Sequence, residues 1–121
     1  MPRHKVLVVD DNADSARMLA MLVRLGGHEV KAAVGGAEAL AAVRDFTPGF
    51  AFLDLGMPLM DGFELARRLR LTPGLERVVL VAMTGFGDDD HQRRAREAGF
   101  DHHLVKPADP AEIEKLLAGA G

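Results

Sequence analysis

Side chains with the chemistry of phosphoryl transfer stand directly after apolar runs of this sequence. They are carboxylates, a hydroxyl and an ammonium group: Asp10, Asp11, Asp54, Thr84 and Lys106. Clustered carboxylates repel one another, and hard oxygen ligands of this kind suit Mg²⁺. A magnesium ion on such ligands keeps open positions for phosphoryl oxygens, and a lysine and a hydroxyl can supply further contacts to a PO₃ group. If the fold brings these residues together, they predict a phosphoryl-transfer site.

Asp54 ends the apolar run Phe-Ala-Phe-Leu-Asp and precedes the breaker-rich segment 55–62, Leu-Gly-Met-Pro-Leu-Met-Asp-Gly. A run without polar alternation is typical of a strand covered on both faces. In an open parallel sheet, such strands present their functional groups at their carboxyl ends. Taken alone, Asp54 could equally be a residue that turns the chain after a strand.

The spacing of apolar residues predicts strands that alternate with helices. The expected strands are 6–9, 29–33, 50–54, 78–83 and 101–105, and the expected helices are 14–25, 36–45, 62–70, 88–98 and 109–117. Short connections between such elements favour an α/β domain with a parallel sheet and helices on both faces. We therefore predict a (βα)5, doubly wound sandwich with a flavodoxin-like strand order. Its strand ends would bring the phosphoryl-transfer residues to one edge.

The periodicity of apolar residues predicts which face of each helix is buried. We expect helix 14–25 to bury Met18, Leu19, Leu22, Val23 and Leu25, with Asn12 or Asp14 as its N-cap. We expect helix 62–70 to start at the N-cap Asp61, with Phe63, Ala66 and Leu69 inward and Arg67, Arg68 and Arg70 outward. In segment 88–98 only Ala95 and Ala98 are apolar, and we interpret Arg93, Arg94 and Arg96 as a solvated face. This helix is therefore expected to be weakly anchored.

The composition indicates one compact unit over residues 1–121. A hydrophobic content of 48% can build a core, and without Cys the chain has no disulfide framework or thiolate metal site. These features favour a reducing compartment, with the cytoplasm as the expected location. No apolar run approaches membrane-spanning length, so we expect no membrane insertion. The net charge of -3 argues against a direct role in nucleic-acid binding.

The order of the short motifs resembles the receiver domain of two-component response regulators. The motifs are Val-Val-Asp10-Asp11-Asn, Leu53-Asp54-Leu-Gly-Met-Pro-Leu-Met-Asp61-Gly62, Met83-Thr84-Gly85 and Val105-Lys106-Pro107. The resemblance covers nearly the whole chain. Each motif alone is common, but together, in this order at strand ends, they are specific to that family.

The resemblance implies a role for each site residue. Asp54 would accept a phosphoryl group from a phosphohistidine donor, and Thr84 and Lys106 would bind phosphoryl oxygens. Asp11, Asp54 and the Gly56 carbonyl would ligate Mg²⁺ or Mn²⁺, with Asp10 acting mainly through a metal-bound water. The bond between Lys106 and Pro107 would be cis. The domain would catalyse its own phosphorylation and dephosphorylation as a signalling module.

The resemblance also implies partners. The phosphodonor would be a sensor histidine kinase or a histidine phosphotransfer domain, and the output face would be formed by segments 88–98, 101–105 and 109–117. The family often has Tyr or Phe three residues before the lysine as a switch residue, whereas this chain has His103. Gly56 and the segment 99–104 resemble receivers of hybrid histidine kinases, in which case the domain would lie at the cytoplasmic face of a membrane.

Two alternatives come from other functional classes. A phosphohydrolase of the haloacid dehalogenase type also uses an Asp nucleophile with Mg²⁺, but it needs a second acid two residues later, where this chain has Gly56. A flavodoxin-like binding module would need a hydroxyl-rich or glycine-rich phosphate loop after the first strand. Asp10 and Asp11 would repel a phosphate there.

Overall fold

The computed structural model describes residues 3–57, 59–85, 89–106 and 108–119. Strands and helices alternate through these residues. The strands are β1 (Lys5–Val9), β2 (Glu29–Ala33), β3 (Phe50–Asp54), β4 (Val79–Thr84) and β5 (His102–Val105). The helices are α1 (Ala13–Leu25), α2 (Gly36–Ala42), α3 (Gly62–Arg70), α4 (Asp89–Glu97) and α5 (Pro110–Gly119). The predicted (βα)5 fold is confirmed.

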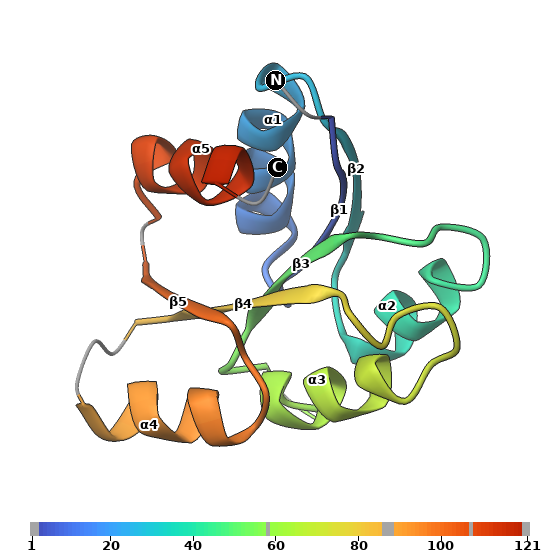
Figure 1. Ribbon diagram of the computed structural model, residues 1–121, viewed down its shortest axis with the longest axis vertical. Coiled ribbons are helices and arrows are strands. Elements are labelled where there is room, and N and C mark those ends of the chain that lie inside the picture. Colours follow the sequence, from blue (N-terminus) through green and yellow to red (C-terminus); the bar gives the residue numbers. More distant parts are fainter. Residues whose placement is uncertain (1–2, 58, 86–88, 107, 120–121) are drawn as a thin grey trace.

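All neighbouring strands of the sheet are parallel, in the order β2-β1-β3-β4-β5. Figure 1 shows α1 and α5 on one face of this sheet and α2, α3 and α4 on the other. The central strand β3 is buried along its whole length, which explains its continuous apolar sequence. The strand order reverses between β1 and β3, and such a switch point is where open α/β sheets form functional crevices.

The core is divided by the sheet into two layers. Leu7, Leu53 and Leu80 point toward α2, α3 and α4, whereas Val8 and Phe52 belong to the layer beneath α1 and α5. Alternate residues of each strand thus contribute to opposite layers, as the two-residue period of a strand requires. This packing fixes the register of every strand that delivers a site residue.

Some predicted helix details are wrong. In α1, Met18 and Leu25 are exposed, with relative accessibilities of 67% and 78%. The buried stripe of α1 instead comprises Ala16, Leu19, Ala20 and Val23. Small alanines allow α1 to lie close to the sheet, so Met18 and Leu25 remain in solvent, whereas Leu22 is partly buried against the core. Helix α2 ends at Ala42 rather than at residue 45, because the following turn uses tighter bonds such as Arg44 N–H to Ala41 O.

The predicted caps agree with the structure. The Asn12 side chain accepts a hydrogen bond from Ser15 N–H, and the Asp61 side chain accepts one from Glu64 N–H. Each bond satisfies one of the free backbone donors at the start of a helix. Gly99 follows α4 with φ of 100°, a left-handed conformation that glycine adopts readily.

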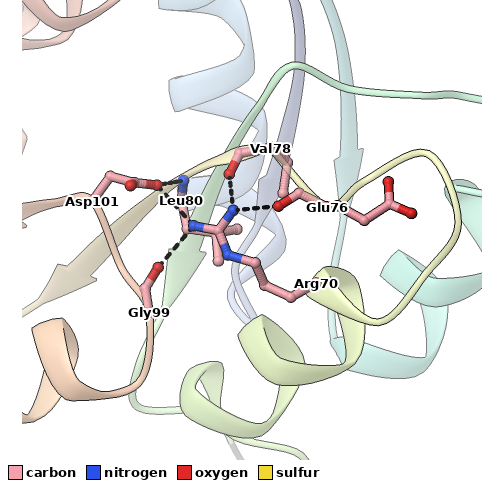
Figure 2. Close-up of polar contacts among 6 residues, drawn as sticks. All are labelled: Arg70, Glu76, Val78, Leu80, Gly99 and Asp101. Atoms are coloured by element: carbon pink, nitrogen blue, oxygen red, sulfur yellow. Dashed lines mark hydrogen bonds and ion pairs between the residues drawn. The ribbon is translucent and has the colours of Figure 1, made fainter.

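Arg70 does not point into solvent as predicted but joins α3 to the start of β4 and to the turn between α4 and β5. Figure 2 shows its guanidinium donating to the carbonyl oxygens of Val78 (2.7 Å), Glu76 (3.1 Å) and Gly99 (2.8 Å), and pairing with Asp101 Oδ2 at 3.0 Å. Asp101 Oδ2 also accepts from Leu80 N–H at 2.8 Å. We call this set of contacts the Arg70 brace.

Candidate functional site

The carboxyl ends of four adjacent strands hold the predicted site residues. Asp10 follows β1, Asp54 ends β3, Thr84 ends β4 and Lys106 follows β5. Parallel pairing aligns these ends: Leu53 pairs with Val9, Asp54 with Met83, and Thr84 with Val105. A hydrogen bond from Lys106 N–H to Thr84 O, at 2.7 Å, continues the pairing of β4 with β5. The sheet therefore brings together residues that are far apart in the sequence.

The acidic residues form a compact group of oxygen ligands. Asp10, Asp11 and Asp54 each offer a carboxylate oxygen, and these oxygens all lie within 4.8 Å of one another. Asp10 and Asp54 are buried, with relative accessibilities of 2% and 7%, whereas Asp11 is exposed. Carboxylates at this separation disfavour one another's charge and suit a hard divalent cation with access from solvent on the Asp11 side.

Lys106 lies between the two buried carboxylates. Its Nζ is 2.9 Å from Asp10 Oδ2 and 3.1 Å from Asp54 Oδ2. Burial of the ammonium lowers the pKa of Lys106, but its hydrogen bonds and attraction to Asp10 and Asp54 outweigh this effect and raise that pKa on balance. The lysine is therefore a permanent positive charge of the site. The sequence predicted that Lys106 contacts a phosphoryl group. It did not predict that, in the unmodified site, Lys106 already offsets the repulsion between the carboxylates of Asp10 and Asp54.

The second oxygen of each buried carboxylate is held by its own loop. Asp10 Oδ1 accepts a hydrogen bond from Asn12 N–H, and Asp54 Oδ1 accepts one from Gly56 N–H, each at 3.0 Å. Backbone donors and Lys106 thus fix both carboxylates from opposite sides. Such support orients a nucleophilic oxygen before any substrate arrives.

A pocket of about 280 Å³ opens over Asp54. Gly56, Thr84, Gly85 and Lys106 line it, together with Leu55, Asp61, Phe63 and Arg94. Thr84 is buried, with a relative accessibility of 4%, and Gly56 leaves the space beside Asp54 open because it has no side chain. The pocket combines a carboxylate with a hydroxyl and cationic groups, and the hydroxyl and cations are suitable donors to phosphoryl oxygens.

The sequence matches the response regulator receiver domain family over residues 6–118. The chain belongs to this family. Neither the haloacid dehalogenase-like hydrolase nor the flavodoxin-like binding module is supported. A receiver domain is a signalling module, and the arrangement at Asp54 is consistent with the phosphoacceptor function of this family.

Solved structures and curated relatives agree with this assignment. The chemotaxis protein CheY4 of Vibrio cholerae has a TM-score of 0.90 at 28% identity, with 98% of each chain covered. A response regulator from Chloroflexus aurantiacus has a TM-score of 0.88 at 31% identity, covering 98% of this chain and 97% of that one.

Among curated proteins, the DNA-binding response regulator MtrA of Mycobacterium leprae is 37% identical over 92% of this chain. The gliding motility regulatory protein of Myxococcus xanthus is 38% identical over 86%. This chain spans 48% of the length of the first relative and 13% of the second.

The predicted switch residue His103 lies on β5 opposite Ala82 of β4. It is half-buried and lines a hollow of about 140 Å³ that also involves Gln92, Ala95 and Arg96 of α4. The receiver domain therefore places His103 beside α4. The predicted cis bond between Lys106 and Pro107 lies outside the described residues, as does the expected helix start at Asp88.

Sequence reasoning did not single out Arg94 as a site residue. Its guanidinium carbon lies 4.9 Å from the centre of the Phe63 ring, at the mouth of the receiver's pocket. The only available signal was the run Arg93, Arg94 and Arg96, which does not indicate which arginine faces the site. Among the described helices, none is long and apolar enough to span a membrane.

Proposed function

We propose that Asp54 is the phosphoacceptor of a two-component phosphorelay. The observation that carries the proposal is the position of Lys106 between Asp10 and Asp54 at the base of an open pocket. An Asp54 carboxylate oxygen forms a bond to phosphorus as the bond from phosphorus to a donor imidazole nitrogen breaks. The electron pair of the broken bond goes to that nitrogen, and the product is an acyl phosphate on Asp54.

Thr84 and Lys106 receive the transferred group. As Asp54 becomes an acyl phosphate, the Lys106 ammonium moves from carboxylate oxygens to phosphoryl oxygens, and the Thr84 hydroxyl donates a hydrogen bond from the end of β4. Both residues would stabilise the charge that develops during transfer to and from Asp54. In this way the domain would catalyse its own phosphorylation and dephosphorylation.

Asp10, Asp11 and Asp54, with the Gly56 carbonyl, would hold Mg²⁺ or Mn²⁺. The compact set of carboxylate oxygens fits such an ion. When bound, the ion neutralises charge on the phosphoryl oxygens. The exposed Asp11 contributes a ligand without a lysine partner in the described salt bridges, so its substitution should weaken metal binding most selectively.

The proposed phosphodonor is a sensor histidine kinase or a histidine phosphotransfer domain. The receiver would act as one unit over residues 1–121, and it would work in the cytoplasm.

The output face would be formed by α4, β5 and α5. In α4, Ala95 is the one residue recorded as buried among those with described side chains. This face would bind a downstream protein rather than nucleic acid, because the net charge of the chain is -3.

Labelling with acetyl phosphate and Mg²⁺ tests the proposal. The wild-type protein should gain one phosphoryl group, detectable by intact mass, and Asp54→Asn should gain none. Asp45→Asn, which changes an exposed acid after α2, is the matched control and should be labelled normally. Labelling of Asp54→Asn at the wild-type stoichiometry would overturn the assignment.

Amide hydrogen exchange tests the output face. Adding acetyl phosphate and Mg²⁺ should change protection in α4 and around His103, while the buried stripe of α1 should be unaffected. Unchanged exchange in α4 and β5 of a fully phosphorylated sample would place the output elsewhere.

A further inference from the structure

Arg94 of α4 faces the phosphoacceptor pocket, unlike the neighbouring arginines. Its guanidinium lies over the Phe63 ring at 4.9 Å, and it lines the pocket together with Asp54, Thr84 and Lys106. By contrast, Arg93 pairs with Asp90 at 2.7 Å on the exposed side of the same helix. The structure therefore selects one arginine from the cluster as a neighbour of the site.

Arg94 also separates this pocket from a second hollow of about 430 Å³ between α3 and α4. Asp61, Phe63 and Arg94 line both spaces, and Glu64, Arg67 and Glu97 are found only in the second. A movement of the Arg94 side chain into the first space would therefore change the shape and charge of the second. Of the three residues shared by the two spaces, Arg94 is the only cation.

Phosphorylation changes the charge that Arg94 faces. The phosphoryl group on Asp54 carries about two negative charges in place of the single charge of the carboxylate, and it brings three strong acceptor oxygens. In the unmodified site the Lys106 ammonium is already shared between Asp10 and Asp54. Arginine forms planar, paired hydrogen bonds with phosphoryl oxygens, and these are stronger than the attraction of an exposed guanidinium to an aromatic face.

We propose that Arg94 is a second cationic phosphoryl-binding residue, which leaves Phe63 and contacts the phosphoryl group on Asp54. This inference rests on the proposed phosphorylation of Asp54. The contact connects α4 directly to the modified site and removes the Arg94 side chain from the lining of the hollow between α3 and α4. Arg94 thus transmits the change at Asp54 to α4 by a route that does not involve the predicted switch residue His103.

Titration with beryllofluoride in the presence of Mg²⁺ measures the contact, because this anion occupies the place of a phosphoryl group on a carboxylate. Arg94→Gln should weaken beryllofluoride binding at least about tenfold, the size of effect expected for loss of one charge-assisted hydrogen bond. Arg93→Gln removes the same charge from the same helix and should bind as the wild type does. Equal affinity of the two variants would overturn the role of Arg94.

Phe63→Leu supplies a test that does not depend on the folding of the Arg94 variant. It removes the aromatic face that holds Arg94 in the unmodified state and keeps the arginine, so beryllofluoride should bind at least as tightly as to the wild type. Weaker binding to Phe63→Leu, matching that of Arg94→Gln, would show that both changes merely disturb the pocket.

The movement itself can be observed by NMR of the arginine Nε–H groups. The Phe63 ring current should shift the Arg94 signal in the unmodified protein, and beryllofluoride should abolish that shift while leaving the Arg93 signal in place. A ring-shifted Arg94 signal that persists at saturation would refute the movement. If the wild type itself takes neither beryllofluoride nor phosphate, the proposed function fails, whereas normal labelling with an unmoved Arg94 refutes only this inference.

Discussion

Replacing Arg70 by Met should destabilise the receiver more than any other arginine substitution on α3. The Arg70 brace makes four contacts from a side chain that is 27% accessible, and one of them, to Val78 O, is part-buried. A net contribution of about 0.5–1.5 kcal/mol per hydrogen bond sets an upper limit of about 6 kcal/mol. The other acceptors lie near solvent and regain water, so we expect a loss of about 2 kcal/mol.

This loss should be visible in both chemical and thermal unfolding. For a domain of this length, about 2 kcal/mol corresponds to a decrease in Tm of roughly 6–10 °C. Arg68→Met is the matched control, because Arg68 lies on the same helix and, among the described residues, its side chain pairs with Glu64 at 3.3 Å on the exposed surface. Its loss should be at most about 0.5 kcal/mol.

A double-mutant cycle separates the ion pair from the rest of the Arg70 brace. Asp101→Asn keeps an acceptor for Leu80 N–H but removes the charge that faces Arg70. The coupling between the two substitutions should be about 1 kcal/mol or less, since Asp101 is 44% accessible. If Arg70→Met unfolds at the same urea concentration as Arg68→Met, the brace contributes nothing to stability and our reasoning is wrong.

Further substitutions test other contacts. His28 is buried, and its Nδ1 accepts a hydrogen bond from His4 N–H. Burial, and to a lesser extent the charge of His4, lowers the pKa of His28 below 6.5. The contribution of His28 to stability is therefore present above pH 6.5 and is lost as the pH falls from there toward the pKa in the folded state. Urea unfolding at pH 7.5 and 5.5 should show this loss in the wild type, and His28→Gln should lose less; equal losses would exclude His28 as the cause. Lys106→Met should retain the fold but bind Mg²⁺ about threefold or more tightly, because an ammonium no longer competes for Asp10 and Asp54; weaker Mg²⁺ binding by calorimetry would contradict this. Gly62→Ala would place Cβ 2.6 Å from Asp54 O, and we expect it to lower the free energy of unfolding by about 1–3 kcal/mol and to slow acetyl phosphate labelling. Gly56→Ala is the control, because the nearest atom to its Cβ would be Asp54 Oδ1 at 3.8 Å. Similar stability of the two variants would refute the argument.

The fold and most of the site could be predicted because local and global signals agree. Continuous apolar runs marked the buried strands, and chemically informative residues stood at their ends, so alignment of parallel strands placed Asp10, Asp54, Thr84 and Lys106 at one edge. The caps Asn12 and Asp61 were likewise local features, detectable from residue type and position.

The details that escaped prediction depend on contacts between distant segments. Periodicity places Arg70 on a polar face, but the acceptors that draw it inward belong to β4 and to the turn before β5. Asp90 is spaced to pair with either Arg93 or Arg94 of α4, and the residue that Arg94 contacts instead, Phe63, lies on another helix. Met18 of α1 was placed in the core by counting apolar residues, whereas the sheet accepts only a narrow stripe of that helix.

The hydrogen bond between Lys106 and Asp10 joins residues separated by 96 positions, and this separation affects folding during synthesis of the chain. During synthesis from the amino terminus, β1 and β3 leave the ribosome with their carboxylates long before Lys106 does. Until the last strand docks beside β4, the nascent chain holds an acidic cluster without its internal cation. Free Mg²⁺ in the surrounding solution would relieve that repulsion, so the ion proposed for the phosphoacceptor site would also assist the folding of the unfinished domain.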